Sequence, residues 1–364
     1  MLYARRQRDT GSSPMKSYKV VEFGQPLQRI EEANPAPQGS EILVRVTAAG
    51  VCHSDVHLWE GFFDMGGGNK VSTQKTMNPP RTMGHEIVGQ VVAMGPDAKG
   101  AKVGDNAVVY PWIGCGKCWY CQSGIEHLCP TPRALGVNND GGYADHVLVP
   151  HAKYLYPYGN IPTELACLYA CSGITAFGAV KKAVGQDGGK PILIIGGGGL
   201  GLMGLQFAKS VLGHAPIVAD IDENKRKLAM ENGALAAIDP RDKEARKTVQ
   251  ELTGGTGVGT AIDFVGAESS AQFGLRALAR GGRLVIVGLF GGNFSIPLPM
   301  FAFTGCQIVG SVTGSPAEMK EMMDLVTGGK VTAVPIVKRK LDKADTTLQE
   351  LRKGLIMGRA VLVP

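Results

Sequence analysis

Four cysteines lie close together in the chain, at Cys115, Cys118, Cys121 and Cys129. Thiolates separated by two, two and seven residues can occupy the four tetrahedral positions around one Zn²⁺, and a closed site of this kind is structural. The alternative is a redox-active or disulfide-bonded loop, which is typical of small oxidised extracellular scaffolds. In a 364-residue chain that starts without an apolar leader, this spacing favours zinc over disulfide pairs. The segment therefore predicts a structural zinc site.

Three further candidate metal ligands are scattered along the chain. Cys52 lies in VCHSDVH, His85 lies in TMGHE, and ELACLYACSGITAFGA supplies either Cys167 or Cys171. These last two cysteines are four residues apart and would share one face of a helix. One of them can be an ordinary buried cysteine. Three nitrogen and sulfur ligands with one open position are typical of a catalytic zinc, so we expect two zinc ions per chain.

Polar side chains accompany these ligands. Ser54 and His57 follow Cys52 in the same heptapeptide, and both can take part in proton transfer. Glu86 directly follows His85 and could support that ligand or bind the metal transiently. The alternatives are a turn hydroxyl for Ser54 and a surface histidine for His57.

A glycine-rich turn follows an apolar stretch in ILIIGGGGLGLMGLQFA, where Gly196, Gly198 and Gly201 form the pattern GxGxxG. Between a strand and a helix, these glycines permit a tight turn and close approach of the backbone to a pyrophosphate at the helix N-terminus. The residues that we expect to face a dinucleotide are Gly196, Gly198, Gly199, Leu200 and Gly201. Such a pattern alone is a weak signal.

Asp220 strengthens this signal because it ends the next apolar segment, PIVAD, 19 residues after Gly201. A carboxylate at this place can accept hydrogen bonds from the adenosine ribose and would repel a 2′-phosphate. Lys225 and Arg226 follow closely and weaken the discrimination. The pattern nevertheless favours NAD over NADP.

Length and composition predict a globular protein of about two domains. Hydrophobic residues make up 44% of the chain and charged residues 19%, and no apolar run is long enough to span a membrane. The net charge of +6 is spread along the chain, which argues against a nucleic-acid partner. We expect no membrane association and a cytoplasmic location, because the start MLYARRQRDTGSSP lacks a secretory signal.

The pattern of short segments changes along the chain. Segments 41–51, 85–95, 105–112 and 143–150 are β-rich and separated by Gly, Pro and Asp, which indicates a barrel-like unit. Between Lys190 and Gly292, buried strands alternate with helical patterns, which predicts a doubly wound parallel sheet. The expected division is a disordered extension at 1–14, a catalytic domain at 15–172, a nucleotide-binding domain at 173–311 and a return to the catalytic domain at 312–364.

In combination, these motifs resemble the zinc-dependent medium-chain alcohol dehydrogenases, over about residues 16–364. The shared motifs are CHSDVH, GHE, the four-cysteine lobe, Cys-x3-Thr-Ala-x-Gly, the glycine turn and the terminal GRAVLVP. The resemblance implies a Rossmann sheet joined to a GroES-like barrel. It also implies that Cys171, four residues before Thr175, is the third ligand and that Cys167 is structural. Related polyol dehydrogenases carry Glu at that place, and the zincless quinone reductases lack the ligands.

The resemblance further implies individual roles. Ser54 would receive the alcohol proton, and His57 would pass it to solvent through the nicotinamide ribose. His53 and Arg359 would lie near the pyrophosphate, and Lys225 near the adenosine ribose. Thr175 and Val287 would complete the cofactor contacts. The plain alternatives are a solvated neighbour for His53 and a rim charge for Arg359.

Aromatic residues could line an apolar substrate pocket. We select Trp112, which precedes the cysteine lobe, together with Phe62 and Trp59, although core packing is an equal alternative for all three. The Gly-rich segment between Trp59 and Gly84 is longer than in the family, and we expect a mobile rim of the cleft or a surface insertion there.

The sequence thus predicts an NAD-dependent oxidoreductase that converts a primary or secondary alcohol to an aldehyde or ketone and back. A specialised polyol, amino-alcohol or thiol-adduct dehydrogenase of the same superfamily is the alternative. A non-catalytic zinc and nucleotide binding protein would lack a ligand or a relay residue, and none is missing. The resemblance also implies a homo-oligomer, either a tetramer or a dimer.

Overall fold

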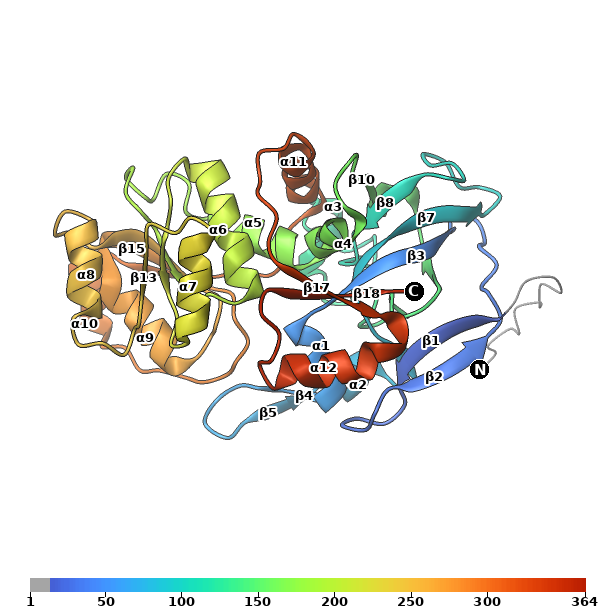
Figure 1. Ribbon diagram of the computed structural model, residues 1–364, viewed down its shortest axis with the longest axis horizontal. Helices are drawn as coiled ribbons and strands as arrows, with labels where there is room; N and C mark the ends of the chain where they lie inside the picture. The colour runs from blue at the N-terminus through green and yellow to red at the C-terminus, as the bar shows by residue number, and fades with distance from the viewer. Residues whose placement is uncertain (1–13) are drawn as a thin grey trace.

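The computed structural model describes residues 14–364, so the extension expected at 1–14 lies outside the described residues except for Pro14. Two parts lie side by side in Figure 1, a β-rich part that carries β1 to β3 and a part with a helix-covered parallel sheet that carries α6 to α9. Helix α5 (Ser172–Lys181) lies between them.

The β-rich part is built on a mixed sheet in the order β10-β8-β7-β3-β18-β17, with β9 also paired to β3. All pairs are antiparallel except β17 with β18. A second sheet has the order β2-β1-β6. The strands are β1 (Met15–Val20), β2 (Gln28–Glu32), β3 (Ile42–Val51), β6 (Arg81–Thr82), β7 (Glu86–Met94), β8 (Asn106–Val109), β9 (His146–Val149), β10 (Leu155–Pro157), β17 (Ile336–Lys340) and β18 (Arg359–Val363).

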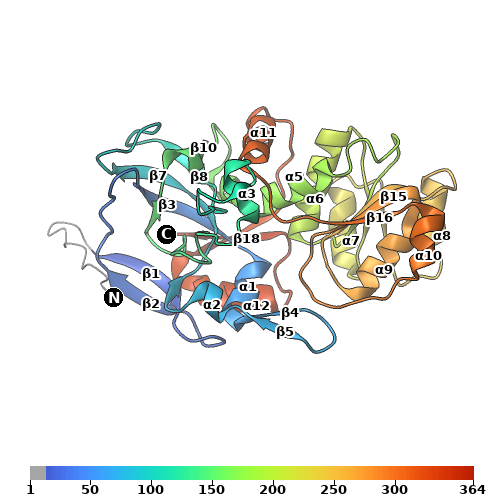
Figure 2. The ribbon, with the colours of Figure 1, turned by 180° about the vertical axis from the view of Figure 1, so that it is seen from behind.

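Short helices connect these strands. They are α1 (His53–Glu60), α2 (Gln74–Met77), α3 (Trp119–Gln122), α4 (Thr163–Ala166), α11 (Pro316–Thr327) and α12 (Ala344–Arg352). Helix α11 begins at Pro316, because Ser315 and Glu318 form a reciprocal capping box and Pro316 occupies the first turn. Figure 2 shows the opposite side of the molecule, where α3 lies on the β-rich part.

The second part is a parallel sheet in the order β13-β12-β11-β14-β15-β16, the doubly wound arrangement of dinucleotide-binding proteins. Its strands are β11 (Leu193–Ile195), β12 (Ile217–Ala219), β13 (Ala236–Ile238), β14 (Val258–Asp263), β15 (Leu278–Ile286) and β16 (Gln307–Gly310). Its helices are α6 (Gly199–Leu212), α7 (Glu223–Glu231), α8 (Ala245–Leu252), α9 (Glu268–Ala277) and α10 (Leu298–Thr304).

Both faces of the parallel sheet are buried, which explains the continuous apolar strands in the sequence. Ile194 belongs to a large core that continues through α5 into the β-rich part, whereas Leu193 and Ile195 belong to a separate core on the opposite face. After the parallel sheet the chain returns to the first part, where Ala360 of β18 pairs with Val51 of β3. This pairing places the last strand of the chain beside the candidate metal ligand Cys52.

The segment between Trp59 and Gly84 is not the structureless loop that its composition suggested. It forms an antiparallel hairpin of β4 (Phe62–Asp64) and β5 (Lys70–Ser72), followed by α2. The hairpin contacts the parallel-sheet part, because a Cβ on Gly66 would lie 2.4 Å from the backbone of Gly292.

No single helix within residues 14–364 is long and apolar enough to cross a membrane. One bent pair, Thr163–Ala170 with Ser172–Lys181, passes by length and composition.

Candidate active site and its zinc centres

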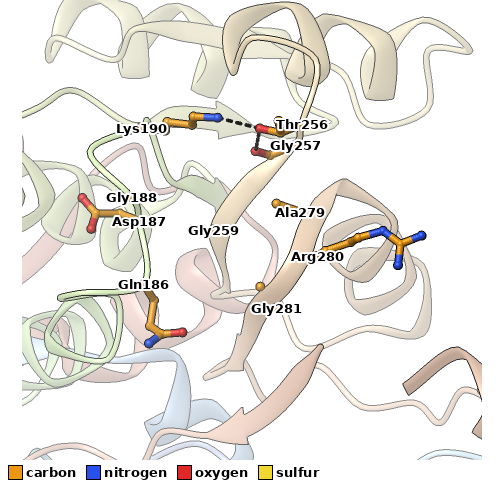
Figure 3. A pocket seen from close by; sticks show the side chains of 11 residues that line it. Gln186, Asp187, Gly188, Lys190, Thr256, Gly257, Gly259, Ala279, Arg280 and Gly281 are labelled. Atoms are coloured by element: carbon orange, nitrogen blue, oxygen red, sulfur yellow. Dashed lines mark hydrogen bonds between the residues drawn. The ribbon is translucent and has the colours of Figure 1, made fainter. Parts of the chain in front are cut away.

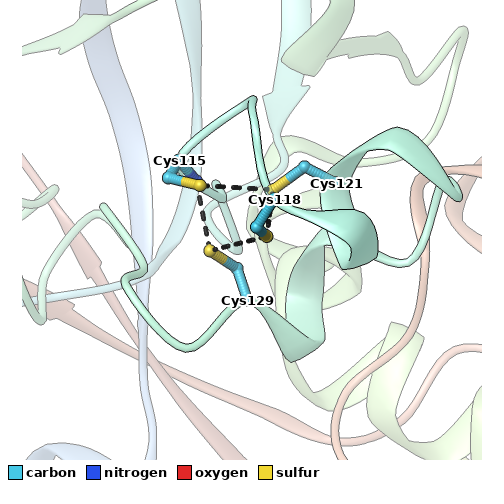
Figure 4. Close-up of side chains that lie close together, drawn as sticks. All are labelled: Cys115, Cys118, Cys121 and Cys129. Carbon is cyan, nitrogen blue, oxygen red and sulfur yellow. Dashed lines mark hydrogen bonds between the residues drawn. The ribbon is translucent and has the colours of Figure 1, made fainter.

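The four sulfurs of the cysteine lobe converge on one point (Figure 4). The Sγ–Sγ distances are 4.0 Å for Cys115 to Cys121, 3.5 Å for Cys118 to Cys121 and 3.7 Å for Cys118 to Cys129. Sulfurs about 2.3 Å from a tetrahedral zinc lie about 3.8 Å apart, so the tetrad fits that ion. Four ligands fill its coordination, and no position remains open for a substrate.

Backbone groups of the lobe support the thiolates. The amide of Cys115 donates to Sγ of Cys129, and the amide of Gly116 donates to Sγ of Cys121, both at 3.3 Å. Glu126 anchors the lobe, because its buried carboxylate accepts from the amide of Gly114 and from the hydroxyl of Tyr154. Sequence reasoning missed Glu126, since a lone glutamate within the lobe carries no distinguishing pattern.

A second cluster brings together Cys52, His85 and Cys171, whose ligand atoms all lie within 4.8 Å of one another. Cys52 follows β3 directly, His85 immediately precedes β7, and Cys171 lies at the start of α5. Both ring nitrogens of His85 are buried and neither makes a hydrogen bond. An orphaned imidazole nitrogen beside two thiols 4.0 Å apart fits a zinc ion with one open coordination position.

Cys167 takes no part in this cluster, because its thiol instead contacts the backbone carbonyl of Glu164 at 3.3 Å. Within the cluster, the hydrogen bond from Cys171 lowers the pKa of the Cys52 thiol well below its usual value, and His85 adds to this effect against the cost of burial.

Carboxylates lie behind the ligands. Oδ1 of Asp55 is 3.0 Å from Nδ1 of His85, which leaves Nε2 for the metal. Glu86 is fully buried, where Oε1 accepts from the amide of Ser172 at 2.9 Å and Oε2 forms an ion pair with Arg359. Burial raises the pKa of the Glu86 carboxyl, and the positive charge of Arg359 opposes that rise. The structure thus places Glu86 behind the ligands and paired with arginine.

The predicted relay residues lie on α1. Oγ of Ser54 is 3.7 Å from Sγ of Cys52, and His57 lies one turn further along the helix. The ring centroid of His57 is 5.5 Å from that of the exposed His53 and 5.2 Å from that of Phe63. Burial and the neighbouring His53 lower the pKa of His57, which keeps its imidazole neutral and able to accept a proton at neutral pH.

The glycine turn has the geometry that its sequence predicts. Gly196 adopts a φ of +97°, and a Cβ on Gly201 would lie only 1.7 Å from the carbonyl oxygen of Gly196. Asp220 closes the turn, since Oδ2 accepts from the amide of Gly197 at 2.7 Å and Oδ1 accepts from the amide of Asp222 at 2.9 Å. Only glycine at 201 permits this close packing of the helix on the strand.

Arg359 joins the turn to the metal cluster. A Cβ on Gly199 would lie 2.4 Å from Cδ of Arg359, so the arginine stem packs against the N-terminus of α6 while its guanidinium pairs with Glu86. Arg359 is only 6% exposed, and its Nε has no hydrogen-bond partner. Arg359 is therefore not a charge on the rim of the cleft.

The other candidate cofactor residues lie on several elements. Lys225 lies in the first turn of α7, where its amide is 3.4 Å from the side chain of Asp222. Arg226 donates to the carbonyl of Asp220 and pairs with Asp239, so its charge is partly engaged. The remaining candidates are Gly198 as the residue before α6, Leu200 within α6, Thr175 within α5 and buried Val287 after β15.

The three aromatic candidates differ in their surroundings. The Trp112 ring lies 5.3 Å from the His85 ring, and its indole donates to the carbonyl of Ala170. Phe62 lies beneath the ammonium of Lys70 on the hairpin. Trp59 is buried, its indole donates to the carbonyl of Gln25, and its ring lies under the guanidinium of Arg352. These are contacts of core packing. Phe63, which the sequence did not single out, contacts His57 instead.

A cavity of about 540 Å³ lies elsewhere, lined by residues such as Gln186, Lys190, Gly257 and Arg280 (Figure 3). These residues surround the amino ends of β11, β14 and β15. Dinucleotides bind at the carboxyl ends of parallel strands, where Gly196 and Asp220 lie, so this cavity is not the cofactor site.

Comparison with known proteins assigns the family. A family model described as the alcohol dehydrogenase GroES-like domain matches residues 38–160, and one described as zinc-binding dehydrogenase matches residues 199–345. The chain belongs to the zinc-type medium-chain dehydrogenases.

This zinc-type dehydrogenase is 38% identical to a protein named NAD-dependent alcohol dehydrogenase from Sulfurisphaera tokodaii, over 96% of this chain and 100% of the relative. It is 32% identical to a protein named L-threonine 3-dehydrogenase from Pyrococcus furiosus, over 92% and 93% of the two chains. Its fold matches the crystal structure of the alcohol dehydrogenase from Aeropyrum pernix with a TM-score of 0.84, at 33% identity over 96% and 100%. Zinc and a dinucleotide are therefore its cofactors.

Proposed function

We propose that this dehydrogenase oxidises a primary or secondary alcohol with NAD to an aldehyde or ketone and catalyses the reverse reaction. The observation that carries this proposal is the position of Arg359, which contacts both Glu86 behind the metal ligands and Gly199 in the glycine turn. A single buried side chain thereby joins the metal cluster to the expected pyrophosphate position. This contact supports a metal and a cofactor that would be held beside each other, as hydride transfer requires.

The proposed zinc ligands are Cys52, His85 and Cys171 at the reactive centre and the four cysteines of the lobe at a second, structural centre. When bound, the reactive zinc supplies Lewis-acid polarisation of the alcohol oxygen and lowers the pKa of its hydroxyl. Ser54 accepts the hydroxyl proton, and neutral His57 conveys it to solvent. Bound NAD would supply the acceptor for the carbinol hydride, so the alcohol would lose one proton and one hydride, and charge and atoms balance.

NAD is favoured over NADP because Asp220 places a carboxylate at the end of β12, beside the glycine turn. Each carboxylate oxygen accepts one backbone hydrogen bond and keeps acceptor capacity for a ribose hydroxyl. Arg226 forms an ion pair with Asp239. Its positive charge therefore does not fully offset the repulsion between Asp220 and a 2′-phosphate.

The test is a panel of substrates followed by NADH absorbance, with NADP in parallel. Simple primary and secondary alcohols should be oxidised with NAD. Their oxidation with NADP should be much slower. Much higher kcat/KM for L-threonine or for a polyol would move the assignment to the specialised alternative, which the L-threonine 3-dehydrogenase relative also suggests. No turnover with any member, in protein that holds zinc and binds NADH, would indicate a binding protein without activity.

We also infer a homo-oligomer in the cytoplasm. Strand β16 is one of the two outer strands of the parallel sheet, and the segment between β15 and β16 carries exposed large apolar side chains, including Leu289, Phe290, Leu298 and Phe303. An open edge with apolar flanks is suited to pairing with a second copy. All eight cysteines are free, which suits a reducing compartment. Sedimentation should give a dimer or tetramer, and a monomer at micromolar concentration would contradict the inference.

A further inference from the structure

Tyr143 is a fully buried tyrosine whose hydroxyl reaches the carboxylate behind the metal cluster. It donates to Oδ2 of Asp55 at 2.9 Å, while Oδ1 of the same carboxylate lies 3.0 Å from Nδ1 of His85. A continuous chain of contacts therefore runs from Tyr143 through Asp55 to the imidazole that offers Nε2 to the metal. Neither the sequence motifs nor the proposed reaction uses Tyr143.

Asp55 depends on few partners. It is fully buried, its Oδ2 accepts hydrogen bonds from the hydroxyl of Tyr143 and from the amide of Cys52, the latter at 3.0 Å, and its Oδ1 lies at ion-pair distance from Nδ1 of His85. Among residues 14–364, no lysine or arginine forms an ion pair with it. A buried carboxylate needs such hydrogen bonds to stay in place, and the loss of one donor leaves an acceptor without compensation. The amide of Cys52 and the hydroxyl of Tyr143 bind the same oxygen, so together they direct the other oxygen at His85.

The backbone fixes Tyr143 relative to His85. The amide of Tyr143 donates to the carbonyl of Met83, and the amide of Gly142 donates to the carbonyl of Gly84, both at 2.8 Å. The tyrosine ring packs on Gly84, where a Cβ would lie 2.2 Å from Cδ1 of the ring and where φ is +89°. The segment that carries the hydroxyl thus pairs directly with the residues that precede the metal ligand.

We infer that Tyr143 is a positioning residue of the catalytic zinc centre, which acts by orienting Asp55 and, through it, the imidazole of His85. Partners behind a zinc ligand fix its tautomer and ring orientation, and their loss typically weakens metal affinity by about 10- to 100-fold. The inference rests on the proposed zinc ligation by Cys52, His85 and Cys171. It does not depend on the identity of the alcohol.

The test compares zinc release from Tyr143→Phe and from wild type, each challenged with a chromogenic chelator in the absence of NAD. Wild type should release its two zincs in two phases, and the phase that Cys171→Ala lacks belongs to the catalytic centre. Tyr143→Phe should release the catalytic zinc about 10-fold faster and leave the lobe zinc unchanged. Tyr110→Phe is the matched control, because Tyr110 is equally buried but its hydroxyl donates to the carbonyl of Gly314.

A double-mutant cycle separates positioning from general loosening. If Tyr143 acts through Asp55, Tyr143→Phe should add less than about 2-fold to the release rate of Asp55→Asn. An equal factor on both backgrounds would overturn the inference, as would faster release of both zincs together or an unchanged catalytic phase. Wild-type protein without a catalytic zinc phase would instead refute the ligand assignment on which the proposed function depends.

Discussion

The two cysteine-containing centres of this dehydrogenase are built in opposite ways. All four ligands of the lobe come from residues 115–129, and their sulfurs are supported by amides of the same loop. The proposed ligands of the catalytic centre come from residues 52, 85 and 171, and the polar side chains connected behind them are Asp55, Glu86, Tyr143 and Arg359. A centre whose ligands lie in one loop can stabilise that loop, whereas a centre whose ligands come from distant parts of the chain can form only when the whole β-rich part is packed correctly. The two should respond differently to the same kind of substitution.

The largest effect is expected for Cys171→Ala. Loss of one of three protein ligands should release the catalytic zinc and reduce kcat/KM by at least about 10³-fold, because the Lewis acid supplies several kcal/mol of transition-state stabilisation. Zinc analysis should fall from about two ions per chain to about one, with the lobe still occupied.

The matched control is Cys167→Ala, four residues away in the same segment. Its thiol lies in the hydrophobic core, donates to the carbonyl of Glu164 and belongs to neither cysteine cluster, so zinc content and turnover should stay near wild type. Full activity in Cys171→Ala combined with loss of activity in Cys167→Ala would reverse the ligand assignment.

Cys121→Ser should show the complementary pattern. A closed metal site contributes folding free energy, so the variant should lose the lobe zinc and several kcal/mol of stability, with Tm lower by about 5 °C or more. Turnover well below Tm should change much less. Cys306→Ser serves as the control, since this partly exposed cysteine belongs to neither cluster. Lost activity at unchanged Tm would contradict a structural role for the lobe.

This contrast also explains which features the sequence could predict. The lobe follows from spacing alone, and the parallel sheet follows from alternating buried strands and helices. The choice of Cys171 over Cys167 required the resemblance to a family, since helical spacing left both open. The contacts of Tyr143 with Asp55 and of Arg359 with Gly199 connect residues 88 and 160 positions apart in the chain, where no local pattern exists.

The segment between Trp59 and Gly84 shows a different limit. Its glycines suggested a structureless rim, but Gly66 instead permits contact between the hairpin and the backbone at Gly292. The same residue type thus serves a packing contact, which composition alone cannot distinguish from flexibility. Trp59 was likewise selected as a candidate pocket residue, but it packs in the hydrophobic core. Phe63 on the hairpin, which was not selected, contacts His57.

Cofactor preference is expected to depend on Asp220. Asp220→Gly removes the acceptor for the ribose hydroxyls, and hydrogen bonds to a charged group contribute about 1.5–3 kcal/mol. The ratio of kcat/KM for NAD to that for NADP should therefore fall by about 10- to 100-fold. Asp220→Asn keeps an acceptor for the amide of Gly197. This variant therefore distinguishes the effect of the negative charge from the effect of a disturbed glycine turn. A wild-type preference for NADP would refute the assignment.

The smallest effect is expected for His57→Gln, which keeps the side chain polar but removes the base. Because burial lowers the pKa of His57, the wild-type imidazole is neutral above that pKa, and the oxidation rate should fall only as the pH drops through it. The variant loses this titration and depends on water, hydroxide or buffer. Near pH 7 it should be about 10-fold slower, and the gap should close toward about pH 9 as hydroxide takes over.

Rescue by buffer distinguishes a relay from a structural histidine. Added imidazole or another small base should restore part of the rate of His57→Gln, whereas Ser54→Ala should be slower and resist rescue, because Ser54 lies directly beside the proposed ligand Cys52. His127→Gln is the control, since His127 is also half-buried with a pKa lowered by burial but lies in the lobe. Equal pH profiles for wild type and His57→Gln would show that the proton leaves by another route. His57 would then have no part in the proton relay from the metal centre.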